Sequence, residues 1–326
     1  MSALAHLYLE RGDSVSGSDA APGAVLDALA AAGARVSVGH DAANLGEAEV
    51  VVVSTAIDPA NPELLEARRR ALRVVSRGRA AADLAAKMVQ VAVAGTHGKT
   101  TTTTMVAAAL ASRHPMVLSG GRLPGSEYNS TPGAGKLAVV EADESDGSFL
   151  ELAPDIGVVT NVEADHLDRY RDLGEITRAF ERFAARVTST LVACVDDPGA
   201  RSLLAVAPGE ITSYGFSPEA ELRGEDYAAR AGGSVFIVRS PWGDAEVSLS
   251  VPGRHNAANA MAALAVGLRL GVSMQELLDG LAACELPGRR MELVGEIGGA
   301  RVYDDYGHHP TEVAATLAAA RELGAE

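Results

Sequence analysis

A glycine-rich segment, GTHGKTTTTT at residues 95–104, follows an almost wholly apolar stretch and leads into a helical pattern. In the order strand, glycine turn and helix, backbone N–H groups and the helix N-terminus can bind phosphates. We expect Lys99 to neutralise the β- and γ-phosphates of ATP and the Thr100 hydroxyl to bind Mg²⁺. Gly95 lies three residues before Gly98, closer than in the GxxxxGK[ST] pattern. A fortuitous glycine turn is the alternative, and the apolar strand before the turn argues against it.

A carboxylate ends a second apolar stretch. The segment KLAVVEADESDGSFL, residues 136–150, places Glu141 after the apolar run and continues into an acidic turn. Because the carboxyl ends of parallel strands meet at one edge of a sheet, Glu141 would lie beside the phosphate loop. We expect it to bind Mg²⁺ there, although an acidic surface loop would have the same sequence.

A third apolar stretch has the same form. The segment DIGVVTNVEADHLDRY, residues 155–170, ends in polar residues that include His166. A lone histidine is more often structural than a metal ligand. Since three strand ends of one type converge here, we interpret His166 as a metal ligand.

Two amides and a histidine open a long helical pattern. The segment PGRHNAANAMAALAVGL, residues 252–268, contains His255, Asn256 and Asn259. Asn256 could simply cap the helix. Asn259 lies one turn later, and paired amides can bind an adenine edge, so we expect this turn to contact the base of ATP.

Charged residues follow around a predicted hinge. GRRME, residues 288–292, supplies Arg290, and YDDYGHHPTE, residues 303–312, supplies Asp305 and His308. A guanidinium at a hinge is suited to stabilising a γ-phosphoryl group in transfer when domains close.

The elements that must position these residues alternate between helices and strands. In residues 1–88, short apolar strands alternate with helical patterns, which predicts βαβ units and a parallel sheet. Helices are expected near 2–11, 23–33 and 61–71. Asp19 ends the VSGSD strand, where a Rossmann-like unit places an acidic residue near a ribose or base, although a solvated turn is an even alternative.

The predicted fold class is α/β with three units. Residues 1–88 form a Rossmann-like domain that lacks its first strand and glycine-rich loop. Residues 89–286 form a central P-loop ATPase domain with a mostly parallel sheet, to which hairpin patterns at about 211–250 add a small antiparallel extension. Residues 287–326 give one strand and one helix, the start of a Rossmann-like C-terminal domain.

Composition excludes some classes of protein. A chain of 326 residues is long enough for two or three domains. Its formal net charge of −15 argues against nucleic acid as a partner, because such binding needs a basic surface. The two cysteines, Cys194 and Cys284, lack the spacing of a metal cluster, and we expect both to be buried in a reducing compartment.

No stretch of the sequence approaches the roughly 20 apolar residues of a membrane span. We therefore expect a cytoplasmic protein with no membrane partner. The sequence does not indicate an oligomeric state.

In their order along the chain, GTHGKTTTT, EADESDGSF, TNVEADHLDRY, HNAAN, RRME and DDYGHHPTE resemble the motifs of the Mur ligase family of peptidoglycan synthesis. The resemblance runs from residue 1 to residue 326. Within the family, it is strongest to the members that add L-alanine to UDP-N-acetylmuramate through an acyl-phosphate, with ATP and Mg²⁺.

The resemblance also implies roles for residues. The catalytic residues would be Lys99, Glu141, His166 and Arg290, and the metal ligands Thr100, Glu141 and His166. The ATP-binding residues would be Gly95, Thr96, His97, Gly98, Lys99, Thr100, Thr101, His255, Asn256, Asn259, Arg290, Asp305 and His308. The substrate-binding residues would be Asp19, Asn129, Ser145 and Asp146.

Two departures from the family pattern leave alternatives open. The family places a glycine-rich loop before the residues that match Met1, and it continues beyond Glu326, so the chain resembles a member truncated at both ends. The alternatives are the ligase that recycles a tripeptide onto the same sugar nucleotide, and a truncated protein that binds ATP without turnover. A folylpolyglutamate synthase is more remote.

Overall fold

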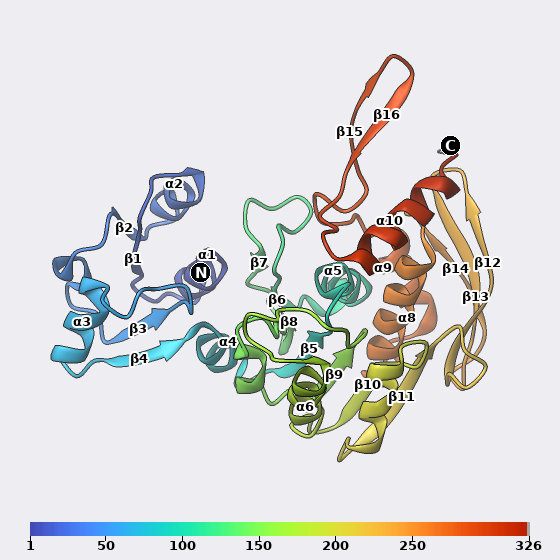
Figure 1. The fold of residues 1–326 in the computed structure, drawn as a ribbon, viewed down its shortest axis with the longest axis horizontal. Coiled ribbons are helices and arrows are strands. Elements are labelled where there is room, and N and C mark those ends of the chain that lie inside the picture. The colour runs from blue at the N-terminus through green and yellow to red at the C-terminus, as the bar shows by residue number, and fades with distance from the viewer. Residues whose placement is uncertain (325–326) are drawn as a thin grey trace.

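The computed structural model of the chain describes residues 1–324. A smaller N-terminal unit lies at one end of the molecule and a large sheet with its helices at the other (Figure 1). Among the described residues, no helix combines the length and the apolar character that crossing a bilayer requires.

The N-terminal unit contains four short strands in two separate sheets. Its strands are β1 (Ser16–Asp19), β2 (Arg35–Val38), β3 (Val50–Val53) and β4 (Arg73–Ser76). Its helices are α1 (Ser2–Glu10), α2 (Ala24–Ala31), α3 (Pro62–Arg69) and α4 (Arg77–Ala85), with a 3₁₀ turn η1 (Ala42–Leu45). Parallel pairing is present as expected, but it joins β1 only to β2 and β3 only to β4. Hydrogen-bonded strands lie about 5 Å apart. Strands β1 and β3 are not paired, and a cleft of about 2120 Å³ lined by residues of both lies between the two strand pairs.

Ten strands form the large sheet in the order β14-β13-β12-β11-β10-β9-β5-β8-β6-β7. Their bounds are β5 (Val89–Ala94), β6 (Met116–Leu118), β7 (Ser130–Thr131), β8 (Leu137–Glu141), β9 (Ile156–Val159), β10 (Thr190–Cys194), β11 (Glu210–Gly215), β12 (Leu222–Arg230), β13 (Gly233–Arg239) and β14 (Ala245–Leu249). The pairs from β6 through β12 are parallel, and β12, β13 and β14 pair antiparallel. The mostly parallel sheet with an antiparallel extension is thus confirmed. The extension begins at β12, since β11 still pairs parallel with β10.

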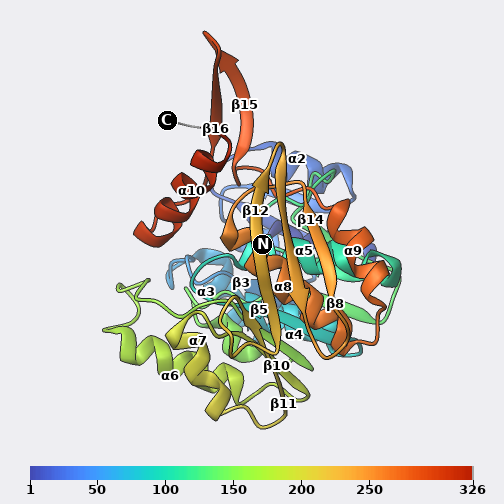
Figure 2. The same ribbon diagram turned by 90° about the vertical axis from the view of Figure 1, so that its right-hand side faces the viewer.

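Alternating side chains of the strands build two cores, one on each face of the sheet. Val91 and Val93 of β5 pack with α5 (Lys99–Ala109), α8 (Arg254–Arg269) and α9 (Met274–Ala282). Ala92 and Ala94 face the other way and pack with α1, α4 and α6 (Leu173–Ala184). Strand β5 is therefore buried on both faces, which explains its continuous apolar sequence. In Figure 2, α8 and α9 lie against β12 and β14.

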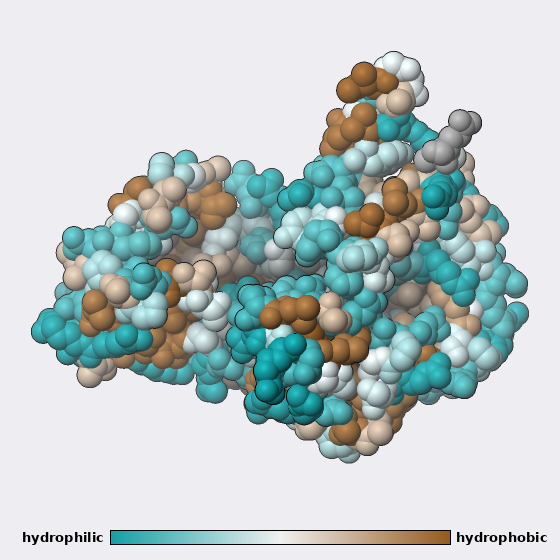
Figure 3. Space-filling model, in the orientation of Figure 1, coloured by the Kyte–Doolittle hydropathy of each residue, from teal (hydrophilic) through white to brown (hydrophobic). Residues whose placement is uncertain are grey.

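The connections between the strands of the large sheet also contain four short helices: η2 (Ala111–Arg113), η3 (Ser148–Glu151), α7 (Pro198–Ser202) and η4 (Leu203–Ala205). The chain then forms a hairpin of β15 (Glu292–Ile297) and β16 (Ala300–Asp304), followed by α10 (Pro310–Glu322). One strand was expected in this part, and β15 is an addition. Every residue of β15 is exposed, so no burial pattern marks it as a strand. Hydrophobic side chains lie on this projecting hairpin, with Ile297 76% exposed (Figure 3).

Candidate active site

The phosphate loop joins β5 to α5, and residues that directly follow β9 hydrogen-bond to it. The Asn161 side chain accepts a hydrogen bond from the His97 N–H at 2.7 Å, and the Thr160 hydroxyl donates to the His97 carbonyl at 2.6 Å. Gly95 has a φ of +137°, and a Cβ there would lie 1.9 Å from the Thr160 hydroxyl oxygen. Gly98, with a φ of +78°, is the N-cap of α5. Both glycines are therefore required by the geometry, which explains the short spacing between them.

Lys99 is buried beside the loop. Its ammonium donates to the carbonyls of Gly95 at 2.8 Å and Thr96 at 3.1 Å, and to the Glu144 carboxylate at 2.9 Å. Burial opposes the charge of Lys99, but the attraction of Glu144, reinforced by nearby Asp143 and Glu141, outweighs it and raises the lysine pKa. The lysine is therefore held as a cation at the phosphate loop.

Thr100 and Glu141 meet at the carboxyl ends of β5 and β8. The Thr100 hydroxyl donates to Glu141 at 3.1 Å, and the Gly120 N–H donates to the other carboxylate oxygen at 2.6 Å. Burial raises the pKa of Glu141, and these hydrogen bonds with the charge of Lys99 partly oppose that shift. Two hard oxygen donors thus lie together at the start of α5, which is the donor chemistry that Mg²⁺ requires.

His166 lies in a different group from Thr100 and Glu141. Its Nε2 is 3.6 Å from Glu144, and the ligand atoms of His166, Glu144 and Asp143 lie within 4.8 Å of one another. The backbone of His166 has a φ of +49°. Glu144 contacts both His166 and Lys99, so it connects this second group to the phosphate loop.

The three residues at the start of α8 lie behind the loop. Asn259 accepts a hydrogen bond from the Thr102 hydroxyl of α5 at 3.0 Å. The Asn256 amide donates to the Pro252 carbonyl at 2.7 Å, and the cap position of the helix is Gly253. Asn256 therefore anchors its own preceding loop, and it does not cap α8.

His255 is close to the hinge. Burial lowers its pKa, while the charges of Asp305 and Glu322 oppose that shift and Arg290 adds to it. The start of α8 thus lies close to the hinge residues Asp305 and Arg290.

The predicted hinge residues Arg290, Asp305 and His308 differ in their contacts. Asp305 accepts hydrogen bonds from the N–H groups of Met291 at 2.9 Å and Gly307 at 2.8 Å, so it holds the loop into α10. The Arg290 guanidinium lies 5.3 Å from the centre of the Tyr306 ring. The His308 side chain is 62% exposed. Among residues 1–324, neither Arg290 nor His308 makes a polar contact with Lys99.

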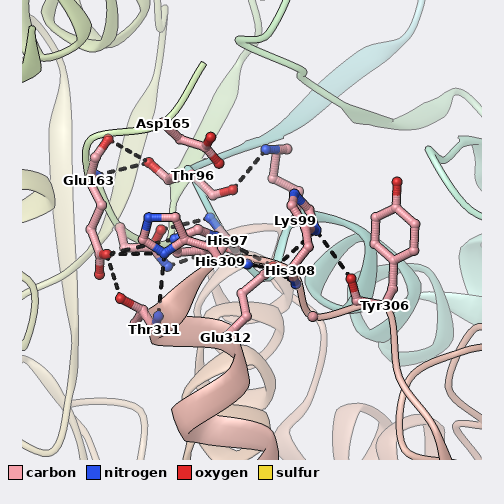
Figure 4. Close-up of polar contacts among 12 residues, drawn as sticks. Thr96, His97, Lys99, Glu163, Asp165, Tyr306, His308, His309, Thr311 and Glu312 are labelled. Atoms are coloured by element: carbon pink, nitrogen blue, oxygen red, sulfur yellow. Dashed lines mark hydrogen bonds and ion pairs between the residues drawn. The ribbon is translucent and has the colours of Figure 1, made fainter. Parts of the chain in front are cut away.

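A second histidine of the same motif, His309, reaches the phosphate loop. Its ring packs against that of His97, with the centroids 4.3 Å apart and the two planes tilted by 36°. Glu163 and Glu312 lie on either side of this pair, and Thr311 donates a hydrogen bond to Glu163 at 2.7 Å (Figure 4). The beginning of α10 is thereby packed directly against the loop.

The predicted substrate residues are not all brought together. Asn129 lines a pocket of about 90 Å³ that also includes Met1, Arg77 and Glu141. Asp146 contacts Arg77 at 3.2 Å. Asp19 instead lines the separate cleft between β1 and β3.

Ser145 lies in the acidic turn, where its N–H donates to Asp143 at 3.0 Å. Arg77 of α4 contacts both Asp143 and Asp146, and it therefore fixes this turn against the N-terminal unit.

Sequence reasoning assigned no role to Glu144, Glu163 or Glu312, although all three lie in the quoted motifs. Glu144 contacts Lys99, while Glu163 and Glu312 flank the His97–His309 pair. Their positions among several neighbouring acidic residues gave no signal, because only the fold shows which carboxylate faces a cation.

Three family models match the chain. The Mur ligase family catalytic domain matches residues 1–88, the Mur ligase middle domain residues 93–267, and the Mur ligase glutamate ligase domain residues 289–326. The site is that of an ATP-dependent ligase, and the chain belongs to the Mur ligase family.

Curated relatives of the chain belong to the same family. The chain is 47% identical to the UDP-N-acetylmuramate–L-alanine ligase of Thermobifida fusca, over 98% of this chain and 69% of that protein. It is 50% identical to the protein of the same name from Acidothermus cellulolyticus, with the same coverage of both chains.

Solved structures with similar folds include two members of the family. The UDP-N-acetylmuramate–alanine ligase of Thermotoga maritima matches with a TM-score of 0.85 at 29% identity, over 99% of this chain and 75% of that chain. A murein peptide ligase from Psychrobacter arcticus matches with a TM-score of 0.82 at 28% identity, over 99% and 74% of the two chains.

Proposed function

We propose that the protein joins L-alanine to the carboxylate of UDP-N-acetylmuramate with hydrolysis of ATP to ADP and phosphate. The observation that carries this proposal is the identity of 47% and 50% to relatives of that name over 98% of the chain. The phosphate loop, with Lys99, Thr100 and Glu141 in contact range, supports an ATP-dependent step. We further propose the cytoplasm as its location, since the reaction consumes ATP.

The proposed chemistry has two steps. A carboxylate is a poor acyl donor because oxide is its leaving group. The carboxylate oxygen therefore attacks the γ-phosphorus of ATP, the bond to the β-phosphate oxygen breaks, and ADP leaves. The alanine amine then attacks the carbonyl carbon of the acyl-phosphate, loses a proton, and expels inorganic phosphate to leave an amide.

In this proposal, the residues of the loop bind and orient the nucleotide. Lys99 offsets charge on the β- and γ-phosphates, and the N–H groups from Gly98 to Thr101, at the N-terminus of α5, bind phosphate oxygens. Arg290 approaches the γ-phosphate when the third unit closes. The start of α8 contacts the adenine side, with His255 kept neutral by burial.

The donor set fits magnesium. Thr100 and Glu141 offer hard oxygen atoms 3.1 Å apart, and Asp143, Glu144 and His166 offer a second group. When bound, Mg²⁺ would neutralise phosphate charge and make the γ-phosphorus more electrophilic. Glu141, supported by the Gly120 N–H, would hold the first ion in register with the loop.

We also propose that Asn129, Ser145 and Asp146 bind the sugar-acid part of the substrate, and that Asp19 binds its nucleotide part. The pocket of about 90 Å³ between Met1, Asn129 and Glu141 supports the role of Asn129, because it brings an amide beside the proposed metal position. We also propose that the chain is divided into three domains, with boundaries between residues 88 and 89 and between residues 286 and 287.

Phosphate release tests the function. The purified chain is incubated with ATP, Mg²⁺ and UDP-N-acetylmuramate, with L-alanine in one arm and the tripeptide L-alanyl-γ-D-glutamyl-meso-diaminopimelate in the other. Release that depends on L-alanine supports the proposal. Release with the tripeptide alone assigns the recycling activity instead.

A third arm separates binding from turnover. Calorimetric titration with ATP on the same preparation, without an amine, measures nucleotide affinity. ATP binding without phosphate release in either arm would mean that this chain binds nucleotide and does not ligate.

A further inference from the structure

A group of side chains beside the phosphate loop has no part in the proposed reaction. His97, Glu163 and His309 each offer one ligand atom, and these atoms all lie within 4.8 Å of one another. His97 belongs to the loop, Glu163 follows β9, and His309 is the N-cap of α10. Three segments far apart in the sequence therefore converge on one point.

The imidazole of His97 is unusual because one of its nitrogens is left without a partner. The side chain is 9% exposed, and its Nε2 has no hydrogen-bond partner among residues 1–324. A buried polar atom of this kind destabilises the folded chain unless something binds it. Nε2 lies 3.7 Å from the Glu163 carboxylate, so it points into the cluster.

The other nitrogen of His97 faces a carboxylate. Nδ1 is 3.4 Å from the Glu312 carboxylate, which also accepts hydrogen bonds from the N–H groups of His308 and His309. We infer from this contact that Nδ1 carries the proton. The lone pair of His97 is then on Nε2, which is the arrangement in which a carboxylate orients a histidine for a metal ion.

The remaining two ligands are held in place by α10. The Glu163 carboxylate is 3.8 Å from His309 Nδ1 and accepts the Thr311 hydroxyl at 2.7 Å (Figure 4). Donor atoms around a tetrahedral zinc ion lie roughly 3.4 Å apart, as follows from metal–ligand bonds of about 2.0–2.1 Å. A small movement of the side chains would therefore bring the cluster to that spacing.

We propose that His97, Glu163 and His309 form a binding site for a transition-metal ion of the zinc class, separate from the magnesium ligands Thr100 and Glu141. Two imidazoles with one carboxylate suit zinc and leave a fourth position open, whereas magnesium prefers oxygen donors. The ion ties the N-terminus of α10 to the phosphate loop. Its binding stabilises the folded chain and fixes the third unit beside the nucleotide site.

Zinc titration of the full chain tests this site. Zn²⁺ is added in the presence of a chromophoric chelator and excess Mg²⁺, without nucleotide, for the wild type and for two variants. His309→Asn removes the imidazole but keeps a good N-cap for α10. Glu163→Gln removes the charge and keeps an acceptor for Thr311. The matched control is His114→Asn, because His114 is exposed, far from the cluster in sequence, and its φ of +47° suits asparagine.

We expect one tight Zn²⁺ per wild-type chain, unchanged by His114→Asn and weakened roughly tenfold or more in both other variants. Equal affinity in the wild type and the two cluster variants would overturn the proposal. So would displacement of Zn²⁺ by Mg²⁺, since that would place the ion at Thr100 and Glu141. Far-UV circular dichroism shows whether His309→Asn folds. If it does not fold, the Zn²⁺ affinity of Glu163→Gln alone tests the proposal.

Diffraction locates the ion directly. Data from a crystal soaked in Zn²⁺ and measured on both sides of the zinc absorption edge should give an anomalous peak between His97 and His309. A peak beside Glu141 alone would contradict the assignment. These measurements use neither substrate nor turnover, so their outcome is independent of the ligase assay.

Discussion

At the level of single residues, the phosphate loop depends on one buried cation. An ammonium group has three N–H donors, and Lys99 directs them to the carbonyls of Gly95 and Thr96 and to Glu144. The lysine thereby holds the loop in shape before any nucleotide arrives. Its removal affects both the binding of phosphate and the surroundings of a buried carboxylate.

Lys99→Ala should weaken ATP binding roughly tenfold to a hundredfold, because a charge-assisted hydrogen bond contributes about 1.5–3 kcal/mol. Calorimetric titration with ATP and Mg²⁺ measures this. Lys136→Ala is the matched control, since Lys136 is exposed, and it should bind ATP like the wild type. Unchanged affinity in Lys99→Ala would refute the assignment of the loop.

The two buried thiols should make stability fall in alkali. Burial raises the pKa of Cys194 and of Cys284 from 9.0 to about 11. Between pH 9 and pH 11 the unfolded chain loses protons that the folded chain retains, so the free energy of unfolding decreases as the pH rises. Urea midpoints at pH 8, 9 and 10 check this, and the double variant Cys194→Ala/Cys284→Ala should show a shallower decline.

At the level of elements, helix α5 starts at a glycine with an unusual conformation. Gly98 has a φ of +78°, and a Cβ there would lie 3.0 Å from the Asn259 side-chain oxygen. That oxygen accepts the Thr102 hydroxyl, which ties α5 to α8. The loop, α5 and α8 therefore meet at a point that admits no side chain without movement.

Gly98→Ala tests this close approach against Gly232→Ala. Gly232 has a φ of +81° with nothing near its Cβ position, so both variants share the backbone strain of about 1–2 kcal/mol. Gly98→Ala should lose about 1 kcal/mol more, the net contribution of one hydrogen bond. Urea unfolding measures both, and equal losses would show that Asn259 simply moves aside.

The elements that the sequence predicted well are those buried on a sheet. Strand β5 is a continuous apolar run because both of its faces are covered, and α8 is an alanine-rich helix in which every residue from Asn259 to Leu268 is buried. Strand β15 has no buried residue, and it pairs only with β16, so nothing in its sequence distinguishes it from a loop. Helix α4 was not predicted, although its alanine- and arginine-rich sequence favours a helix and the Ser76 side chain caps its N-terminus.

For the site, sequence placed the ends of β5, β8 and β9 together, because parallel strands share an edge. It could not choose among neighbouring carboxylates. Glu141 and Glu144 lie three positions apart, yet only the fold shows that Glu141 faces Thr100 while Glu144 faces Lys99. The contact between the rings of His97 and His309 was equally hidden, since it depends on where α10 packs.

Across the whole molecule, stability should be unevenly distributed. The large sheet carries two extensive cores, whereas β1 and β3 belong to two-stranded sheets on either side of a cleft. Two-stranded pairs are only marginally stable alone. The N-terminal unit should therefore open locally far more often than the large sheet.

Hydrogen–deuterium exchange can measure this difference. Amides of β5 and β9 should exchange with opening free energies about 3 kcal/mol or more above those of β1 and β3. Peptide-level mass spectrometry in native buffer resolves the four strands. Equal protection in both parts would show that the chain unfolds as a single cooperative unit.

The contact between Lys99 and Glu144 has a consequence for which ligands the loop accepts. The Glu144 carboxylate pairs with the lysine as an internal anion, so the phosphates of a nucleotide compete with it for the ammonium group. The apparent affinity of a ligand falls with the fraction of molecules in which the lysine is already taken. A triphosphate carries enough charge to win this exchange, whereas a monophosphate or a nucleoside gains little. Glu144 thus makes the loop favour ligands that carry a high negative charge.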